Sequence, residues 1–286
     1  MPEILQLGPF MIKLDWLLLA VSGLMGYLVM QRRIKQSYYR DKPILDRFST
    51  GLMIVFFVWK FSPVLFTPSI LWENPLGLLT MTGSINGTLL GIAAAILYTN
   101  RWLRRMKVPR LFFADLLSLG TVVMLFVYNL LGWQYGTITT LPWGVSIEDL
   151  DYKYHPVNVY LLLITLPMLI WLWRKSLTLL GTGSMAMNVL IYYGMGLMLV
   201  SFFKQKTSLF VGLSGEQILY LLMMFFGLFL SIFLNKNKQQ EMTSVGERVE
   251  EPNVTAGILP PHSRNAAVDS VRPEDSYEEK RPTLSE

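Results

Sequence analysis

The sequence predicts an all-α, polytopic membrane protein. Hydrophobic residues make up 52% of the chain, the mean hydropathy is +0.40, and the 286 residues include several apolar runs of low charge. An α-helix needs about 20 residues to cross about 30 Å of hydrocarbon. Runs near that length predict seven transmembrane helices, which we place at residues 11–30, 48–69, 86–100, 111–131, 157–173, 185–203 and 217–235.

The positions of Lys and Arg predict the orientation of these helices, because short loops that stay in the cytoplasm are rich in basic residues. Two alternating sets of connecting segments hold thirteen and three basic residues. The first set is 31–47, 101–110 and 174–175, and the second is 70–85, 132–156 and 204–216. We therefore expect the N-terminus outside the cell and the C-terminus inside. The net charge of +5 then reflects contact with anionic inner-leaflet lipid, and no nucleic-acid partner is expected.

The composition divides the chain into two regions. Residues 1–236 form the predicted membrane domain, and its first apolar run lacks a basic flank and a cleavage site, so we expect a retained helix. Residues 237–286 contain few large apolar side chains and are expected to form a disordered cytoplasmic tail. The chain has no cysteine and two histidines, which excludes a cysteine nucleophile and argues against a metal site.

The longest outer loop, residues 132–156, is dense in Gly, Pro, Trp and Tyr. Long loops of this kind are either functional or linkers, and the aromatic content favours an ordered loop. We therefore expect function to face the outer leaflet.

Polar side chains within the predicted helices need a partner, an interface or a cavity, because their burial in hydrocarbon is costly. Lys60 either extends its amine to the outer interface or faces a cavity that receives an anionic head group. Asn86 and Asn129 either join helices by hydrogen bonds or belong to a site. Asp115 follows a basic segment, and we expect it to form an ion pair with a nearby arginine.

Several segments, in order and spacing, resemble the bacterial prolipoprotein diacylglyceryl transferases. TTLPWGV (139–145) is similar to the family's T-D-L-P-W-G-V, and YHPVNVY (154–160) to R-H-P-S/T-Q-L-Y. SINGTLLG (84–91) is similar to S-F-H-G-G-L-I-G, and YYGMGLMLVSFFK (192–204) to Y-G-x-x-R-x-x-V-E-F-F-R. The resemblance covers about 230 residues and omits the tail.

The resemblance implies a multi-pass enzyme of the bacterial plasma membrane. Such an enzyme moves diacylglyceryl from phosphatidylglycerol, or another anionic phospholipid, to the lipobox cysteine thiol of a prolipoprotein. Its partners would be that phospholipid and the prolipoprotein signal peptide, and it would need no cofactor or metal. The thiol must lose a proton, and the leaving phosphate needs cationic stabilisation.

The sequence departs from the family pattern at the positions that carry this chemistry. Asn86 stands at the family's histidine, and Leu197 at an arginine in the sixth predicted helix. In the family's G-R-x-G-N-x-x-N-G-E-x-x-G block, Leu125 stands at the arginine and Trp133 at the glutamate. Leucine can neither bind phosphate nor transfer a proton, so the chain is expected to be a weak or inactive enzyme.

The same alignment places Tyr128 at the family's first asparagine, and a shift of one residue would place Asn129 there instead. The candidate catalytic residues are Asn86, Tyr128, Asn129, His155 and Tyr193. The candidate phospholipid-binding residues are Lys60, Asn86 and Gly136. Three classes of function stay open: a transferase with a rearranged site, a non-catalytic paralogue that binds phospholipid, a signal peptide or a partner enzyme, and an unrelated seven-span transporter or receptor.

Overall fold

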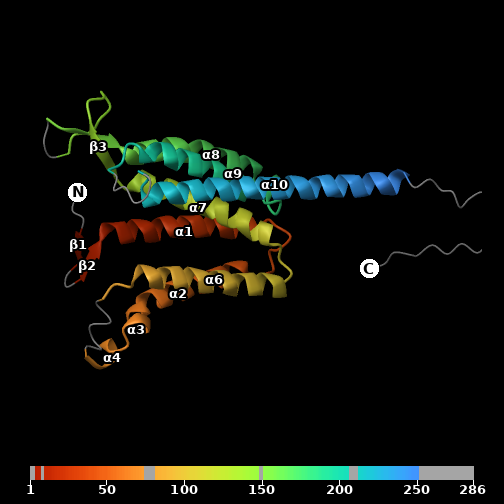
Figure 1. Ribbon diagram of the computed structural model, residues 1–286, viewed down its shortest axis with the longest axis horizontal. Helices are drawn as coiled ribbons and strands as arrows, with labels where there is room; N and C mark the ends of the chain where they lie inside the picture. The colour runs from red at the N-terminus through yellow and green to blue at the C-terminus, as the bar shows by residue number, and fades with distance from the viewer. Residues whose placement is uncertain (1–3, 8–9, 74–80, 148–150, 206–211, 251–286) are drawn as a thin grey trace, which may run out of the picture. The chain divides into compact units, whose positions relative to one another are not determined.

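The computed structural model describes residues 4–7, 10–73, 81–147, 151–205 and 212–250. Most of these residues are helical, and the helices run alternately in opposite directions (Figure 1). Among the described residues, five helices are long and apolar enough to cross a membrane: Leu14–Lys35, Arg110–Leu131, Val157–Lys175, Ser184–Ser201 and Gly215–Asn237. The chain is therefore a multi-pass, mostly helical membrane protein, and the count of seven spans stays a prediction.

The N-terminal segment forms a hairpin before the first helix. Strands β1 (Ile4–Leu7) and β2 (Phe10–Lys13) pair antiparallel, with Leu7 opposite Phe10. Helix α1 (Leu14–Lys35) follows β2 directly. The first helix thus begins three residues later than predicted, because residues 11–13 hydrogen-bond to β1 rather than to the following turn.

The second predicted helix, 48–69, is interrupted. It consists of α2 (Ile44–Lys60) and the short helix α3 (Ser62–Phe66), and α4 (Ile70–Glu73) follows. Pro63 lies in the first turn of α3, where its missing N–H costs nothing, but it cannot continue α2. Pro63 has no N–H for the Trp59 carbonyl oxygen, which instead accepts from the Ser62 hydroxyl at 2.7 Å, and α2 ends just before this point.

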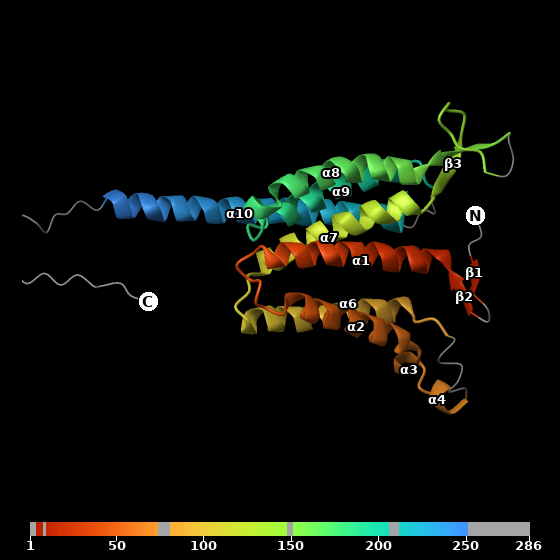
Figure 2. The same cartoon turned by 180° about the vertical axis from the view of Figure 1, so that it is seen from behind.

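Helix α6 (Ile85–Arg105) returns alongside α2 as its partner in a helical hairpin (Figure 2). Ser84 caps its N-terminus by accepting a hydrogen bond from the Gly87 N–H at 3.0 Å. A Cβ on Gly91 would lie 3.0 Å from the Val55 carbonyl oxygen, so the glycine permits the close approach of α2 and α6.

The remaining elements form the other part of the bundle. Helix α7 (Arg110–Leu131) leads to strand β3 (Tyr135–Thr139), which pairs antiparallel with β4 (Lys153–Pro156) through an irregular register. The predicted ordered loop therefore contains a β-hairpin, and residues 148–150 lie outside the described part. Helices α8 (Val157–Leu179), α9 (Ser184–Ser201) and α10 (Gly215–Glu250) follow.

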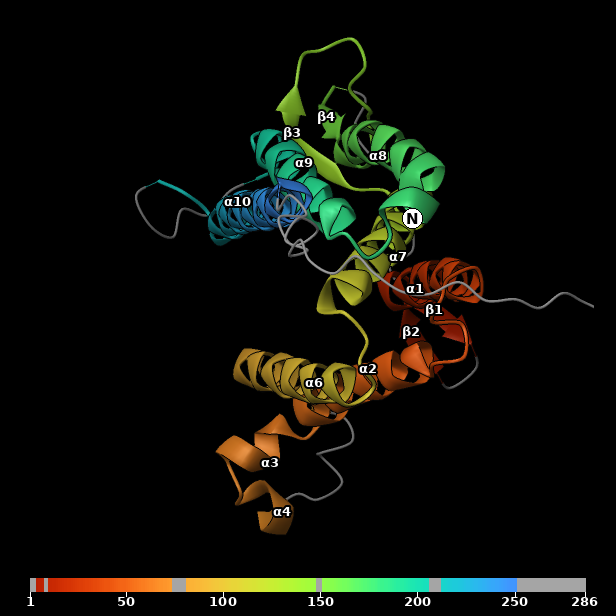
Figure 3. The same cartoon turned by 90° about the vertical axis from the view of Figure 1, so that its right-hand side faces the viewer.

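We call the end of the bundle that carries β1 to β4 the strand end, and the end that carries connections 36–43 and 106–109 the basic end. One apolar cluster, which includes Ile34, Trp102 and Phe112, joins α1, α2, α6 and α7 at the basic end. A second, which includes Leu119, Leu172 and Met185, joins α7, α8 and α9. The end-on view shows α1 and α7 between the α2–α6 hairpin and the pair α8–α9 (Figure 3).

Residues Met1–Gln239 form one compact unit. Helix α10 continues past the predicted end of the last span at residue 235, as far as Glu250. Residues 251–286 lie outside the described part, and the prediction of a disordered tail at 237–286 falls mostly on them.

Candidate functional site

A hydrogen-bonded group of aromatic side chains lies where β4 meets α8 at the strand end. The Trp143 indole N–H donates to the Tyr160 hydroxyl oxygen at 2.9 Å, and His155 Nδ1 lies 2.9 Å from the same oxygen. A hydroxyl can accept one hydrogen bond and donate another. Tyr160 therefore accepts from Trp143, and its hydroxyl also bonds His155 Nδ1; when Nδ1 is the donor, the lone pair of Nε2 stays available.

The ring of Phe203, just beyond α9, completes this group. Its centroid lies 4.8 Å from that of His155 and 5.3 Å from that of Tyr160. His155 is buried, with 7% of its surface exposed. The imidazole is therefore held by packing on one side and by a hydroxyl on the other, which fixes its orientation.

An apolar pocket of about 630 Å³ opens beside Tyr160. Pockets of this size are typical of small-molecule sites, in which a few polar groups orient an apolar ligand. Its lining comes from the strand-end loop, α8 and the end of α9: Trp133, Leu141, Trp143, Val145, Pro156, Val159, Tyr160, Leu163 and Phe203. The pocket fits a hydrocarbon chain, with the Tyr160 hydroxyl as a polar group at its wall.

Gly136 holds β3 against the end of α9. A Cβ at this position would collide with the Phe203 carbonyl oxygen, which accepts a hydrogen bond from the Thr137 N–H at 2.8 Å. The structure thus places Gly136 behind the pocket, where it positions Phe203, rather than among the residues that line it.

The α2–α6 hairpin carries a second polar group at the strand end. The Lys60 amine donates to the Met81 carbonyl oxygen at 2.8 Å. The Ser62 hydroxyl accepts from the Ser84 N–H at 2.8 Å, and Gly87 leaves room for it because a Cβ there would overlap the serine. Asn86, next to this contact, is exposed. These bonds tie α3 to the beginning of α6.

The candidate residues do not form one constellation. Asn86 lies on α6 and His155 precedes α8, with α1 and α7 between these helices (Figure 3). Buried Asn129 donates to the Leu125 carbonyl oxygen of its own helix at 2.7 Å, and Tyr193 donates to the Thr165 hydroxyl of α8 at 2.6 Å. Tyr128 is half-buried on α7.

Sequence reasoning missed several buried polar groups. Gln217 donates from Nε2 to the Ser201 hydroxyl at 2.9 Å, and both are buried between α9 and α10. Asn158 is 4% exposed, and its side-chain oxygen has no hydrogen-bond partner in the described part of the chain. An unpaired buried acceptor is costly, so it marks a place where a ligand or water is expected. The signal was available, because Asn158 stands at the glutamine of the family's H-P-S/T-Q-L-Y motif.

The two leucines that the resemblance aligns with family arginines have apolar surroundings. Leu125 and Leu197 both pack against the cluster that joins α7, α8 and α9. Leu197 also packs against Val157 and Leu161 of α8. Hydrophobic packing therefore surrounds both leucines.

The predicted ion pair of Asp115 is wrong. Its carboxylate is fully buried and accepts backbone N–H bonds from Gly181 and Gly183, each at 2.8 Å, and from Ala186 at 3.0 Å. Charged hydrogen bonds to the first turn of a helix stabilise a carboxylate as well as a cation does. Asp115 therefore fixes the turn between α8 and α9.

Within the described residues, no three His, Asp or Glu side chains gather as metal ligands. The long apolar helices and the polar residues buried between them define an integral membrane protein, which carries an apolar pocket at its strand end. Residues 2–233 match the family model of the prolipoprotein diacylglyceryl transferases, and the chain belongs to that family. A comparison with curated proteins gives no match.

Proposed function

We propose that the chain is a phospholipid-binding member of this family, in the bacterial plasma membrane, in which the transfer reaction is weak or lost. The packing of Leu125 and Leu197 in apolar clusters carries this proposal. The reaction needs stabilisation of a leaving phosphate, which arginine supplies through paired hydrogen bonds and charge. Two half-buried leucines packed against apolar clusters supply neither.

The pocket beside Tyr160 supports the proposal that the protein still binds phospholipid. Its lining is apolar and aromatic, and its volume of about 630 Å³ suits acyl chains better than a head group. His155 and Asn158 are buried and adjoin the lining residues Pro156 and Val159 in sequence. The side-chain oxygen of Asn158 is an acceptor and suits a hydroxyl of the ligand. The ligand class is the diacylglyceryl part of phosphatidylglycerol or of another anionic phospholipid.

A rearranged transferase is the second candidate, and the fixed imidazole of His155 favours it. In that reaction the base takes the proton of the lipobox thiol, and the thiolate sulfur attacks the glycerol carbon that bears the phosphate. A C–S bond forms, the C–O bond breaks, and glycerol phosphate leaves. His155 would be the base, and Lys60 the only candidate cation among the residues proposed from the sequence.

The experiment uses the full chain in vesicles that contain phosphatidylglycerol. Bound phospholipid is counted by mass spectrometry after detergent extraction, for Leu163→Trp, which narrows the pocket, and for Leu166→Trp, which lies outside its lining on the same helix. We expect the first variant alone to lose lipid. Equal lipid content in the two variants would contradict binding in this pocket.

A second measurement separates the two candidates. A synthetic lipobox peptide is incubated with the same vesicles, and its mass is followed. We expect no added diacylglyceryl group. A product that forms with the unchanged chain and disappears with His155→Gln would establish the rearranged transferase instead.

A further inference from the structure

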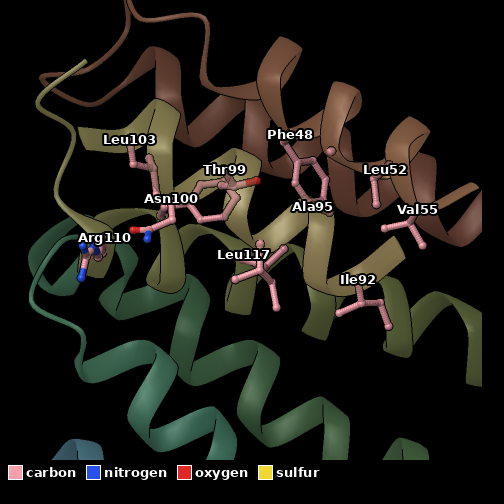
Figure 4. Close-up of a pocket in the computed structure, with 13 residues that line it drawn as sticks. Phe48, Leu52, Val55, Ile92, Ala95, Thr99, Asn100, Leu103, Arg110 and Leu117 are labelled. Carbon is pink, nitrogen blue, oxygen red and sulfur yellow. The ribbon is translucent and has the colours of Figure 1, made fainter. Parts of the chain in front are cut away.

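A second apolar pocket, of about 350 Å³, lies between α2, α6 and α7 (Figure 4). It shares no residue with the pocket beside Tyr160. Val55 and Ile92 lie at one end of it, and Asn100 and Arg110 lie at the other. The groove is therefore amphipathic along its length, with its polar groups at the basic end.

The dimensions of this groove fit one hydrocarbon chain. Its lining runs from Ile92 to Leu103 on α6 and from Phe48 to Val55 on α2, or about 10–16 Å at 1.5 Å per residue. A volume of about 350 Å³ then corresponds to a mean cross-section of about 20–35 Å². A helix about 10 Å across needs about 80 Å², whereas a single methylene chain, with neighbours about 4.5 Å away, needs about 20 Å². The groove therefore accommodates a single acyl chain.

The length also matches one leaflet. Half of a hydrocarbon core of about 30 Å is about 15 Å. The groove begins at the basic end of α6 and stops near the middle of that helix, which runs from Ile85 to Arg105. A chain in the groove therefore belongs to the leaflet at the basic end, whereas the pocket beside Tyr160 lies at the strand end.

The polar end of the groove favours an anion. Arg110 is exposed and has no hydrogen-bond or ion-pair partner within the ranges that the structure describes. It is the first residue of α7, whose N-terminus has no side-chain cap, so free N–H groups and the helix dipole add to its charge. Segments 31–47 and 101–110 hold eleven basic residues against two acidic ones, Asp41 and Asp46.

We propose that this groove binds one acyl chain of an anionic phospholipid from the leaflet at the basic end, with the lipid phosphate at Arg110 and the first turn of α7. Asn100 donates to the phosphate or to an ester oxygen. The acyl chain fills the space between the α2–α6 hairpin and α7, so the lipid contacts both parts of the bundle. The inference does not depend on the pocket beside Tyr160 or on the transfer reaction.

The test uses the full chain in vesicles with a phospholipid that carries a photoreactive group near the end of one acyl chain. The head group is phosphatidylglycerol in one sample and phosphatidylcholine in the other. We expect phosphatidylglycerol to label peptides of α2 and α6 around Val55 and Ile92. One charge-assisted hydrogen bond is worth about tenfold in binding, so phosphatidylcholine should label them about tenfold less.

Two pairs of variants make the result specific. Arg110→Gln should reduce labelling by phosphatidylglycerol to the level of phosphatidylcholine, and Arg104→Gln, an exposed arginine outside the lining, should not. Ala95→Phe should fill the groove and abolish labelling by both lipids, and Ala93→Phe, on the exposed face of the same helix, should not.

The arginine pair answers the question even if Ala95→Phe fails to fold. Equal labelling by the two lipids in the unchanged chain would overturn the proposal. Labelling that survives both Arg110→Gln and a folded Ala95→Phe would also overturn it, because the acyl chain would then lie on the protein surface and not in the groove. A polypeptide bound in place of lipid in a native mass spectrum would overturn it as well.

Discussion

The Asp115 carboxylate on α7 accepts a hydrogen bond from the Gly183 backbone N–H, at 2.8 Å, across 68 positions of sequence. The same oxygen accepts from Gly181, whose φ of 98° is accessible to glycine and strained for other residues. The turn between α8 and α9 is thus held by a side chain from a third helix. The conformation of this turn therefore depends on a buried contact between a side chain and the backbone.

Replacing Asp115 should destabilise the protein strongly. Asp115→Ala leaves up to three buried backbone N–H groups without an acceptor, at about 1–3 kcal/mol each. Asp115→Asn keeps one oxygen and should lie between that variant and the unchanged protein. Thermal unfolding followed by tryptophan fluorescence measures the effect. Exposed Asp41→Ala is the control, and an equal midpoint for the two alanine variants would contradict the structural role.

The close contact of α1 and α7 should be equally sensitive to an added methyl group. A Cβ on Gly26 would lie 2.6 Å from the Gly120 carbonyl oxygen, whereas a Cβ on Gly23 would meet nothing within 4 Å. We expect Gly26→Ala to lower the free energy of unfolding by about 1–3 kcal/mol. Gly23→Ala on the same helix should be neutral or stabilising. Similar stabilities for the two variants would show that α1 and α7 can separate at no cost.

Asn86→His alone should not create a transferase. Removing one preorganised donor typically costs about a hundredfold to a thousandfold in rate. The resemblance implies that a histidine, a glutamate and two arginines are replaced together. Asn86 lies on α6, and α1 and α7 lie between α6 and α8 (Figure 3). Neither the unchanged chain nor Asn86→His should rescue a bacterium depleted of its own diacylglyceryl transferase. Mature, lipidated lipoprotein in the depleted cells would show that a rearranged site works.

The orientation can be tested in living cells. The basic segments predict that the C-terminus lies in the cytoplasm. A reporter enzyme that is active only outside the plasma membrane should be silent when fused after Glu286, and a reporter that needs the cytoplasm should be active. The opposite pattern would reverse the strand end and the basic end relative to the cell.

Hydropathy predicted the long helices well, because a span of low charge leaves few alternatives to a helix in hydrocarbon. The exact place of the break after Lys60 was harder to predict from the sequence. It depends on Pro63 and on the Ser62 hydroxyl, which donates to the Trp59 carbonyl oxygen and accepts from the Ser84 N–H. The partner of Asp115 could not be predicted from sequence. Every residue except proline has a backbone N–H, so the sequence does not reveal which of them will bond a carboxylate. The prediction of an arginine partner was wrong for this reason.

The candidate site was also predicted only in part. The HPVNVY motif predicted His155, and the structure places it against Tyr160. The resemblance also grouped Asn86 and Tyr193 with it, but Tyr193 bonds Thr165 and Asn86 is exposed on α6. An alignment predicts where on the helices the candidate residues lie. It does not predict whether their side chains meet, because that depends on the packing between the helices, such as the packing of Leu125 and Leu197.

Phe203 joins three parts of the molecule. Its carbonyl oxygen accepts from the Thr137 N–H, its ring packs on His155, and the next residue, Lys204, pairs with Glu216 at 3.5 Å. The shape of the pocket is consequently coupled to the connection between α9 and α10 through a single residue. A displacement of Phe203 would therefore disturb the packing of the imidazole, the backbone bond to β3 and the wall of the pocket together.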